Sequence, residues 1–172
     1  TTMVTGRAVN EGSVSRQLWL EGRPAIAEEI MVMRDAMLAE ETGAHVHICH
    51  VSTETSVALI RDAKKRGVQV TCESAPHYML LTDKELLRRD ANWRMNPPLR
   101  EQRDCEAIIE GFCDGTIDAM ITDHAPHSEE DKLKGMAGMV GSETAFGVCY
   151  TKLCREEGLP LELLVHLMST RP

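Results

Sequence analysis

The segment ITDHAPH, residues 121–127, places one carboxylate and two imidazoles directly after an apolar run. Carboxylate and imidazole together suit zinc, and both groups can exchange protons with a substrate. The alternative is a polar turn that holds histidines by chance, with Asp123 capping the next turn. Spacing alone does not separate a metal or catalytic site from such a turn.

A second group of imidazoles lies in the segment HVHICHV, residues 45–51. On a regular strand alternate residues share a face, so His45 and His47 would lie on one face and His50 on the other. The spacing of the first two is frequent in metal sites, but one site on a regular strand could not use all three histidines. Each could equally be a half-buried, hydrogen-bonded strand histidine. The choice stays open at this point.

The segment NPPLR, residues 96–100, predicts a rigid loop. Its two prolines fix the backbone and keep Asn96 out of the α region. Such a loop could present Asn96 and Arg100 to a small polar ligand, or it could be a connector with an exposed arginine. A glycine-rich segment, residues 135–141, could approach a ligand closely, form a mobile lid, or be a solvated surface loop.

Alternating helices and short strands must position these side chains. Apolar periodicity predicts helices over 24–42, 54–66, 101–114, about 143–157 and 160–169, and strands over 45–51, 68–73 and 117–122. This alternation favours a parallel sheet in an α/β fold, where chemistry collects at the carboxyl ends of strands. His50 and Asp123 each lie at or next to such an end.

Two local patterns give sharper expectations for single elements. In the first helix, one apolar face is formed by Ile26, Ile30, Met33 and Met37. The segment TDKE, residues 82–85, predicts a capping box that opens a short helix.

The composition describes an ordinary globular chain of 172 residues, about one domain's worth. A net charge of -8 argues against nucleic acid or an anionic membrane surface as the main partner. The six cysteines form no CxxC pair and fall mostly in apolar runs, which predicts reduced core thiols in a cytosolic protein. Neither a signal peptide nor a membrane span is indicated.

Several segments together resemble one family, the bacterial dihydroorotases of the amidohydrolase superfamily. They are HICHVSTETSVALIRDAKKRGVQVTCESAPHYMLLTD, MNPPLR, EGFCDGTIDAMITDHAPHSEEDK and GMVGSETAF, with NEGSVSRQLWLEGRPAIAEE upstream. The resemblance implies a partial TIM (β/α)8 barrel, about strands six to eight with their helices, over residues 1–172. It also implies zinc-dependent, reversible hydrolysis of the cyclic amide of dihydroorotate to N-carbamoyl-aspartate in de novo pyrimidine biosynthesis.

Site roles follow from the resemblance, position by position. His50 matches a metal-binding histidine, and Asp123 matches the metal-binding aspartate that also acts as catalytic base. The complete enzyme would hold one or two Zn²⁺ ions. Such zinc lowers the pKa of bound water and polarises the ring carbonyl.

Substrate contacts follow in the same way. Asn96 and His127 match substrate-binding residues, and the backbone around Ala137 and Gly138 matches a substrate-contacting segment. The other histidines of the two motifs, His45, His47 and His124, receive no role.

The same comparison exposes gaps. The family's first-strand HxH, its bridging acidic ligand and a further upstream histidine have no counterpart in this chain, and His77-Tyr78 stands where two histidines are common. We therefore expect a fragment that is inactive alone, holds zinc weakly, and associates or aggregates through two open sheet edges. A homo-oligomer and a complex with aspartate carbamoyltransferase are both left open. The alternatives are a non-catalytic structural partner of that transferase, or a hydantoinase- or allantoinase-type hydrolase.

Overall fold

The computed structural model describes residues 8–172, so the first seven residues of the polar N-terminal segment lie outside the described part. Its strands are β1 (Val46–Ile48), β2 (Val70–Ser74) and β3 (Ala119–Met120). They form one sheet in the order β1-β2-β3, and both pairings are parallel. The predicted parallel α/β arrangement is confirmed, although each strand is shorter than predicted.

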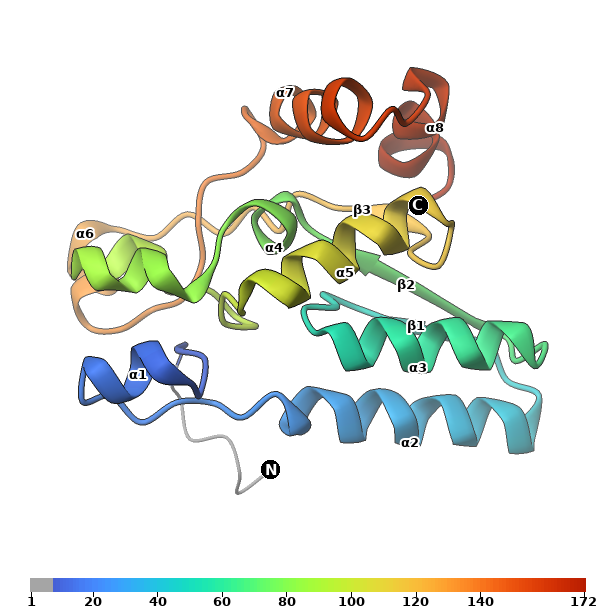
Figure 1. The fold of residues 1–172 in the computed structure, drawn as a ribbon, viewed down its shortest axis with the longest axis horizontal. Helices are drawn as coiled ribbons and strands as arrows, with labels where there is room; N and C mark the ends of the chain where they lie inside the picture. Colours follow the sequence, from blue (N-terminus) through green and yellow to red (C-terminus); the bar gives the residue numbers. More distant parts are fainter. Residues whose placement is uncertain (1–7) are drawn as a thin grey trace.

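Helices connect and cover these strands (Figure 1). The α-helices are α1 (Ser13–Gln17), α2 (Ile26–Thr42), α3 (Glu54–Lys65), α4 (Pro76–Leu80), α5 (Gln102–Cys113), α6 (Glu129–Leu133), α7 (Ala145–Cys149) and α8 (Leu161–Val165). Two 3₁₀ helices, η1 (Asp83–Arg88) and η2 (Ala91–Trp93), follow α4, and π-helical turns η3 (Tyr150–Glu156) and η4 (His166–Thr170) extend α7 and α8.

The three long helices agree with prediction within two residues at each end. Each is followed by a glycine at positive φ, namely Gly43 at 70°, Gly67 at 83° and Gly115 at 79°. A glycine adopts this left-handed conformation without a Cβ clash, so it ends a helix cleanly.

The sheet has one buried face and one open face. Ile48, Val70 and Cys72 point into the main core, where they meet the apolar sides of α3 and α5. Alternate residues point the other way, and His47 is exposed there. The strands β1 and β3 form the two outer edges of the sheet.

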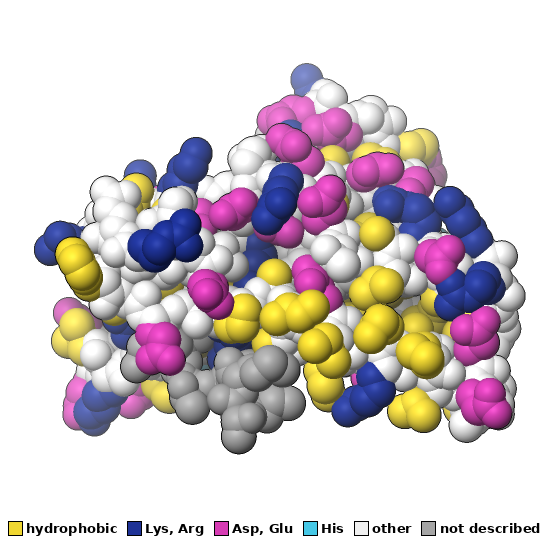
Figure 2. Space-filling view, turned by 60° about the horizontal axis from the view of Figure 1, so that its bottom comes forward, with side chains coloured by type: hydrophobic (Ala, Val, Ile, Leu, Met, Phe, Trp, Pro, Cys, Tyr) yellow, Lys and Arg dark blue, Asp and Glu magenta, His cyan; other side chains and the backbone are white. Residues whose placement is uncertain are grey.

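The apolar face predicted for α2 exists, but it faces outward. Ile26 is 47% exposed and Met37 is 60% exposed. The helix instead buries its smaller residues, Val32, Ala36 and Ala39, on the side where it packs along α3. The larger apolar side chains gather on the surface near this helix (Figure 2).

Two smaller predictions are wrong. The short helix predicted after Thr82 forms as η1, but the capping box is absent, because Thr82 makes no side-chain capping bond and Asp83 accepts a hydrogen bond from Asn10 Nδ2 at 3.2 Å. The six cysteines are free as predicted, but Cys49 and Cys113 are exposed and so are not core thiols. Within residues 8–172, no helix is long and apolar enough to cross a membrane.

Candidate metal centre

The first part of the site is built where β1 ends. The strand stops at Ile48, and His50 has a φ of 56°, in the left-handed region. Its side chain therefore leaves the regular strand alternation. His50 Nε2 lies 3.3 Å from Asp123 Oδ1, and His50 Nδ1 lies 3.9 Å from Glu73 Oε1.

This conformation overturns the expectation that His47 and His50 lie on opposite faces. His47 Nε2 lies 3.3 Å from Glu73 Oε2, so both imidazoles reach the same carboxylate. The expectation assumed a regular strand through residue 50, and the backbone is no longer extended there.

Asp123 follows β3 and also has a left-handed backbone, with a φ of 46°. This region is uncommon for residues other than glycine, and such residues cluster at functional sites because the surrounding structure must hold them. The carboxylate is shared between two imidazoles. Oδ1 faces His50, and Oδ2 lies 3.6 Å from His77 Nε2.

His77 is the member of the cluster that sequence reasoning missed. It lies in the first turn of α4, directly after β2, and is only 4% exposed. Its buried Nε2 has no hydrogen-bond partner among the described residues. Its position in the sequence could have indicated the site, because His77 follows the second strand just as Asp123 follows the third.

The two imidazoles hold protons differently. The pKa of His50 is raised, chiefly by hydrogen bonding to Asp123 and further by the charges of Asp123 and Glu73, against the opposing effect of burial. Burial lowers the pKa of His77 to about 4, and the neighbouring His50 adds to this effect. His77 is therefore neutral near pH 7, as a metal-binding imidazole must be.

His50 Nε2 and Asp123 Oδ1 lie close enough to hold one divalent metal ion, and His77 faces the other oxygen of the same carboxylate. Two imidazole nitrogens and one carboxylate oxygen form a donor set that suits zinc. The unpartnered, buried Nε2 of His77 points at the same carboxylate as His50. A catalytic zinc commonly has three protein ligands, and His50 with Asp123 would supply two of them.

The loop that contains Asn96 is tied to the same region. The Asn96–Pro97 peptide bond is cis, and Tyr78, next to His77, donates a hydrogen bond from its hydroxyl to the Pro97 carbonyl at 3.1 Å. Asn96 Oδ1 accepts a hydrogen bond from Arg23 Nη1 at 2.5 Å. The predicted loop therefore carries a polar amide group, and Arg23 holds that amide in place.

Arg100, by contrast, is not available to a ligand. It is 3% exposed and donates hydrogen bonds to Ser52 Oγ at 3.1 Å and Asn10 Oδ1 at 2.9 Å. Its guanidinium also lies 3.6 Å from Glu28 Oε2. The sequence left two interpretations of Arg100, a ligand contact and an exposed residue of a connecting loop. The structure shows a third role, in which Arg100 is buried and links other segments.

The glycine-rich segment packs back on the ITDHAPH motif. His127 Nε2 donates a hydrogen bond to the Ala137 carbonyl at 3.0 Å. Gly138 has a φ of 142°, and a Cβ there would lie 2.7 Å from the Ala125 carbonyl oxygen, so the approach requires glycine. His124, which had no expected role, accepts hydrogen bonds through Nδ1 from the backbone N–H groups of Gly141 and Ser142.

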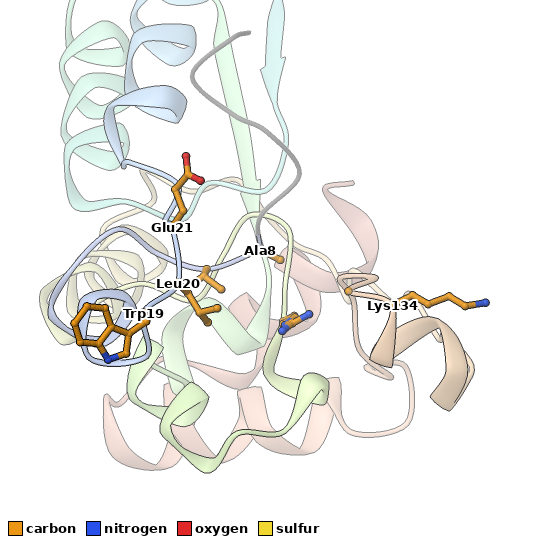
Figure 3. A pocket seen from close by; sticks show the side chains of 8 residues that line it. Ala8, Trp19, Leu20, Glu21 and Lys134 are labelled. Atoms are coloured by element: carbon orange, nitrogen blue, oxygen red, sulfur yellow. The ribbon is translucent and has the colours of Figure 1, made fainter.

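Of two hollows in the surface, one includes a residue of the cluster in its wall and the other does not. One is mostly apolar and includes His77 with Trp93, Met139 and Val148 in its wall. Another lies between the segment around Trp19 and the turn at Lys134 (Figure 3). The Lys134 side chain extends away from Trp19 and Leu20, and none of His50, His77 or Asp123 lines this second hollow.

Known structures define the class of fold. A D-hydantoinase from a Thermus species superposes with a TM-score of 0.82 at 29% identity, over 87% of this chain and 35% of that protein. An L-hydantoinase from Arthrobacter aurescens gives a TM-score of 0.80 at 30% identity, with the same coverage. The chain is thus part of an α/β barrel of the amidohydrolase type.

Sequence relatives narrow this class. The family model described as dihydro-orotase-like matches residues 1–56. A dihydroorotase from Staphylococcus epidermidis is 47% identical over 99% of this chain, and one from Fusobacterium nucleatum is 45% identical over 98%. The chain belongs to the dihydroorotase family, and it spans 41% and 40% of the lengths of these two relatives.

Proposed function

We propose that this chain contributes to a zinc-dependent dihydroorotase, which hydrolyses the cyclic amide of dihydroorotate reversibly to N-carbamoyl-aspartate. The single observation that carries the proposal is the meeting of His50, His77 and Asp123 at the carboxyl ends of three neighbouring parallel strands. The identity to dihydroorotases over nearly the whole chain supports the choice of substrate.

In this proposal His50 and Asp123 hold the metal, and the neutral ring of His77 lies beside the Asp123 carboxylate. Members of the dihydroorotase and hydantoinase families are metal-dependent amidohydrolases, and the mixed imidazole and carboxylate donors favour zinc. When bound, the ion supplies Lewis-acid activation of water and of the amide carbonyl. Because the chain offers only this part of a site, we expect the 172-residue chain alone to bind zinc weakly and to be inactive.

Asp123 is the proposed catalytic base. Its carboxylate can take a proton from the attacking water and pass it to the ring nitrogen that leaves. Its left-handed backbone fixes the carboxylate beside His50, so the proton acceptor is held in one place before the substrate arrives.

Asn96, His127 and the backbone at Ala137 and Gly138 are the proposed substrate contacts. The Arg23 hydrogen bond orients the Asn96 amide, and the His127 imidazole is positioned by the Ala137 carbonyl. Side chains that are held in advance lower the entropic cost of orienting a small polar substrate.

Other features of the account stay predictions. They are the placement of the strands as six to eight of the barrel, the role in pyrimidine biosynthesis, the cytoplasmic location, and assembly as a homo-oligomer or with aspartate carbamoyltransferase. A hydantoinase-type activity is the second candidate, and the similarity to hydantoinase structures favours it.

The proposal is tested by Asp123→Asn in a version extended to the length of the curated relatives. Loss of the base and of one ligand should reduce turnover of dihydroorotate by at least about 10³-fold, while the fold is retained. Glu129→Gln removes the same charge from an exposed position on α6 and should leave turnover unchanged. Turnover by Asp123→Asn at the unsubstituted rate would remove Asp123 from the mechanism.

A further inference from the structure

A second group of metal-ligating side chains lies on the open face of the sheet. It consists of His47, Cys49 and Glu73, each of which offers one ligand atom, and these atoms all lie within 4.8 Å of one another. The group shares no residue with the cluster of His50, His77 and Asp123, and the two clusters meet where Glu73 Oε1 lies 3.9 Å from His50 Nδ1. We call it the open-face cluster.

The register of the sheet explains why these side chains meet. His47 pairs with Thr71 and Ile48 with Cys72, so the next position places Cys49 opposite Glu73. His47 and Cys49 are two residues apart and both are exposed, whereas Ile48 between them is buried. Three different donor types are thus brought together by strand geometry.

The imidazole of His47 is already oriented for ligation. Its Nδ1 shares a hydrogen bond with Thr71 Oγ1 at 2.8 Å, and that hydroxyl also lies 3.0 Å from His45 Nε2. The opposite nitrogen, Nε2, faces Glu73 Oε2 at 3.3 Å. Metal-binding histidines commonly use one nitrogen for an outer hydrogen bond, which fixes the ring while the other binds the ion.

We propose that the open-face cluster is a separate binding site for a borderline-soft divalent cation such as Zn²⁺. The ion is held by His47 Nε2, Cys49 Sγ and a carboxylate oxygen of Glu73, and water completes the tetrahedron. The Cys49 thiol releases one proton to solvent when the ion binds, because the thiolate is the ligand. This inference does not depend on the proposed hydrolase activity.

Cobalt(II) provides the direct test, because it replaces zinc in such sites and a thiolate ligand gives it a charge-transfer absorption band in the near ultraviolet. The 172-residue chain is titrated with Co²⁺ under reducing conditions. We expect a saturable band, its loss in Cys49→Ser, and its removal when Zn²⁺ is added. Cys113→Ser is the matched control, since Cys113 is also free and exposed but lies on α5, and it should keep the band.

Two further variants separate this site from the candidate metal centre. Asp123→Asn and His77→Ala should leave the thiolate band intact, because neither residue belongs to the open-face cluster. Thr71→Val should retain the band but weaken cobalt affinity by about 10- to 100-fold, as loss of an outer hydrogen bond does in other metal sites. Circular dichroism of each variant establishes that it is folded.

Several results would overturn the proposal. They are the absence of a thiolate band at saturating cobalt, its persistence in Cys49→Ser, or its loss in Cys113→Ser. Loss of the band in folded Asp123→Asn would show that cobalt binding at Cys49 depends on the other cluster, which contradicts a separate site. An independent measurement is alkylation followed by mass spectrometry, in which Zn²⁺ should slow modification of Cys49 by about tenfold or more but not that of Cys113. Equal modification of both cysteines would contradict the site.

Discussion

His50 and His77 face opposite oxygens of one carboxylate, yet burial separates their protonation. His50 is partly exposed and its pKa is raised, whereas the enclosed ring of His77 has its pKa lowered to about 4. The same aspartate thus contacts His50, which is protonated more readily than an ordinary histidine, and His77, which stays neutral to a lower pH. Metal binding needs both imidazoles neutral and the carboxylate ionised, so His77 is already in the binding form, whereas an ion must displace the proton that the raised pKa of His50 favours.

This difference predicts the pH dependence of the metal-free chain. Between pH 6.5, the ordinary pKa of histidine, and about 4, His77 takes up a proton in the unfolded state but not in the folded state. The stability contributed by neutral His77 is therefore fully present above pH 6.5 and is lost as the pH falls through this window, by about 3 kcal/mol. Urea unfolding as a function of pH should show this loss in the parent chain and a much weaker one in His77→Gln.

NMR titration of the histidine ring protons provides the control. His77 should keep its neutral chemical shift down to about pH 4, while His50 should change above its ordinary value of 6.5. A midpoint near 6.5 for His77, or identical pH profiles for the parent and the variant, would contradict the assigned environment.

At the level of elements, a buried polar network centred on Arg100 joins four separate segments. Arg100, from the segment before α5, bonds to Asn10 near the N-terminus and to Ser52 after β1, and it faces Glu28 on α2. The Glu28 carboxylate also accepts hydrogen bonds from the backbone N–H and the hydroxyl of Ser52. The network positions the end of β1, and therefore His50, relative to α2.

Arg100→Met should destabilise the chain by about 3 kcal/mol, because it leaves a largely buried carboxylate and two polar partners without their cation. Arg103 supplies the matched control. Its side chain is 70% exposed and lies 3.5 Å from the Glu101 carboxylate, so Arg103→Met should change the free energy of unfolding by less than about 0.5 kcal/mol. Equal effects of the two substitutions in chemical denaturation would show that the network contributes little.

The long elements were predictable because their signals are repeated along the chain. In α3, Val57, Ile60 and Ala63 follow helical spacing and a glycine ends the pattern, and the structure agrees. The strand ends were not predictable in the same way. The left-handed backbone of His50 arises from the tertiary surroundings, and no periodic pattern records it.

The site was predictable only in part for the same reason. His50 and Asp123 were singled out, and the structure brings them together, but their metal-binding roles stay predictions. His77 received no role, although the family commonly has two histidines at the position of His77 and Tyr78. Its importance is visible only when the carboxyl ends of β2 and β3 are placed side by side.

For the whole molecule, the apolar face of α2 and the open edges of the sheet are the surfaces through which the chain is most prone to associate. The helix leaves Ile26, Ile30, Met33, Met37 and Leu38 on the surface. A contiguous apolar surface of this kind marks an interaction site or an aggregation hazard. Since the chain spans only about two fifths of its relatives' length, we expect this surface to drive self-association of the isolated chain.

Charge placed on this surface should weaken that association. In light scattering coupled to size exclusion, the parent chain should show a mass that rises with concentration, and Met33→Glu with Met37→Glu should shift it toward the monomer. Thr55→Glu with Ala58→Glu adds the same charge at exposed positions of α3 and should not. A parent chain that stays monomeric at all concentrations would contradict the expectation.

The central claim, a part of a dihydroorotase built around His50, His77 and Asp123, is tested most directly by substrate choice. The measurement compares zinc-loaded protein, extended to the length of its relatives, on dihydroorotate and on hydantoin. We predict hydrolysis of dihydroorotate with a kcat/KM at least about 100-fold above that for hydantoin, a margin expected when polar groups are positioned for one substrate. A protein that binds zinc but hydrolyses hydantoin and leaves dihydroorotate intact would contradict it.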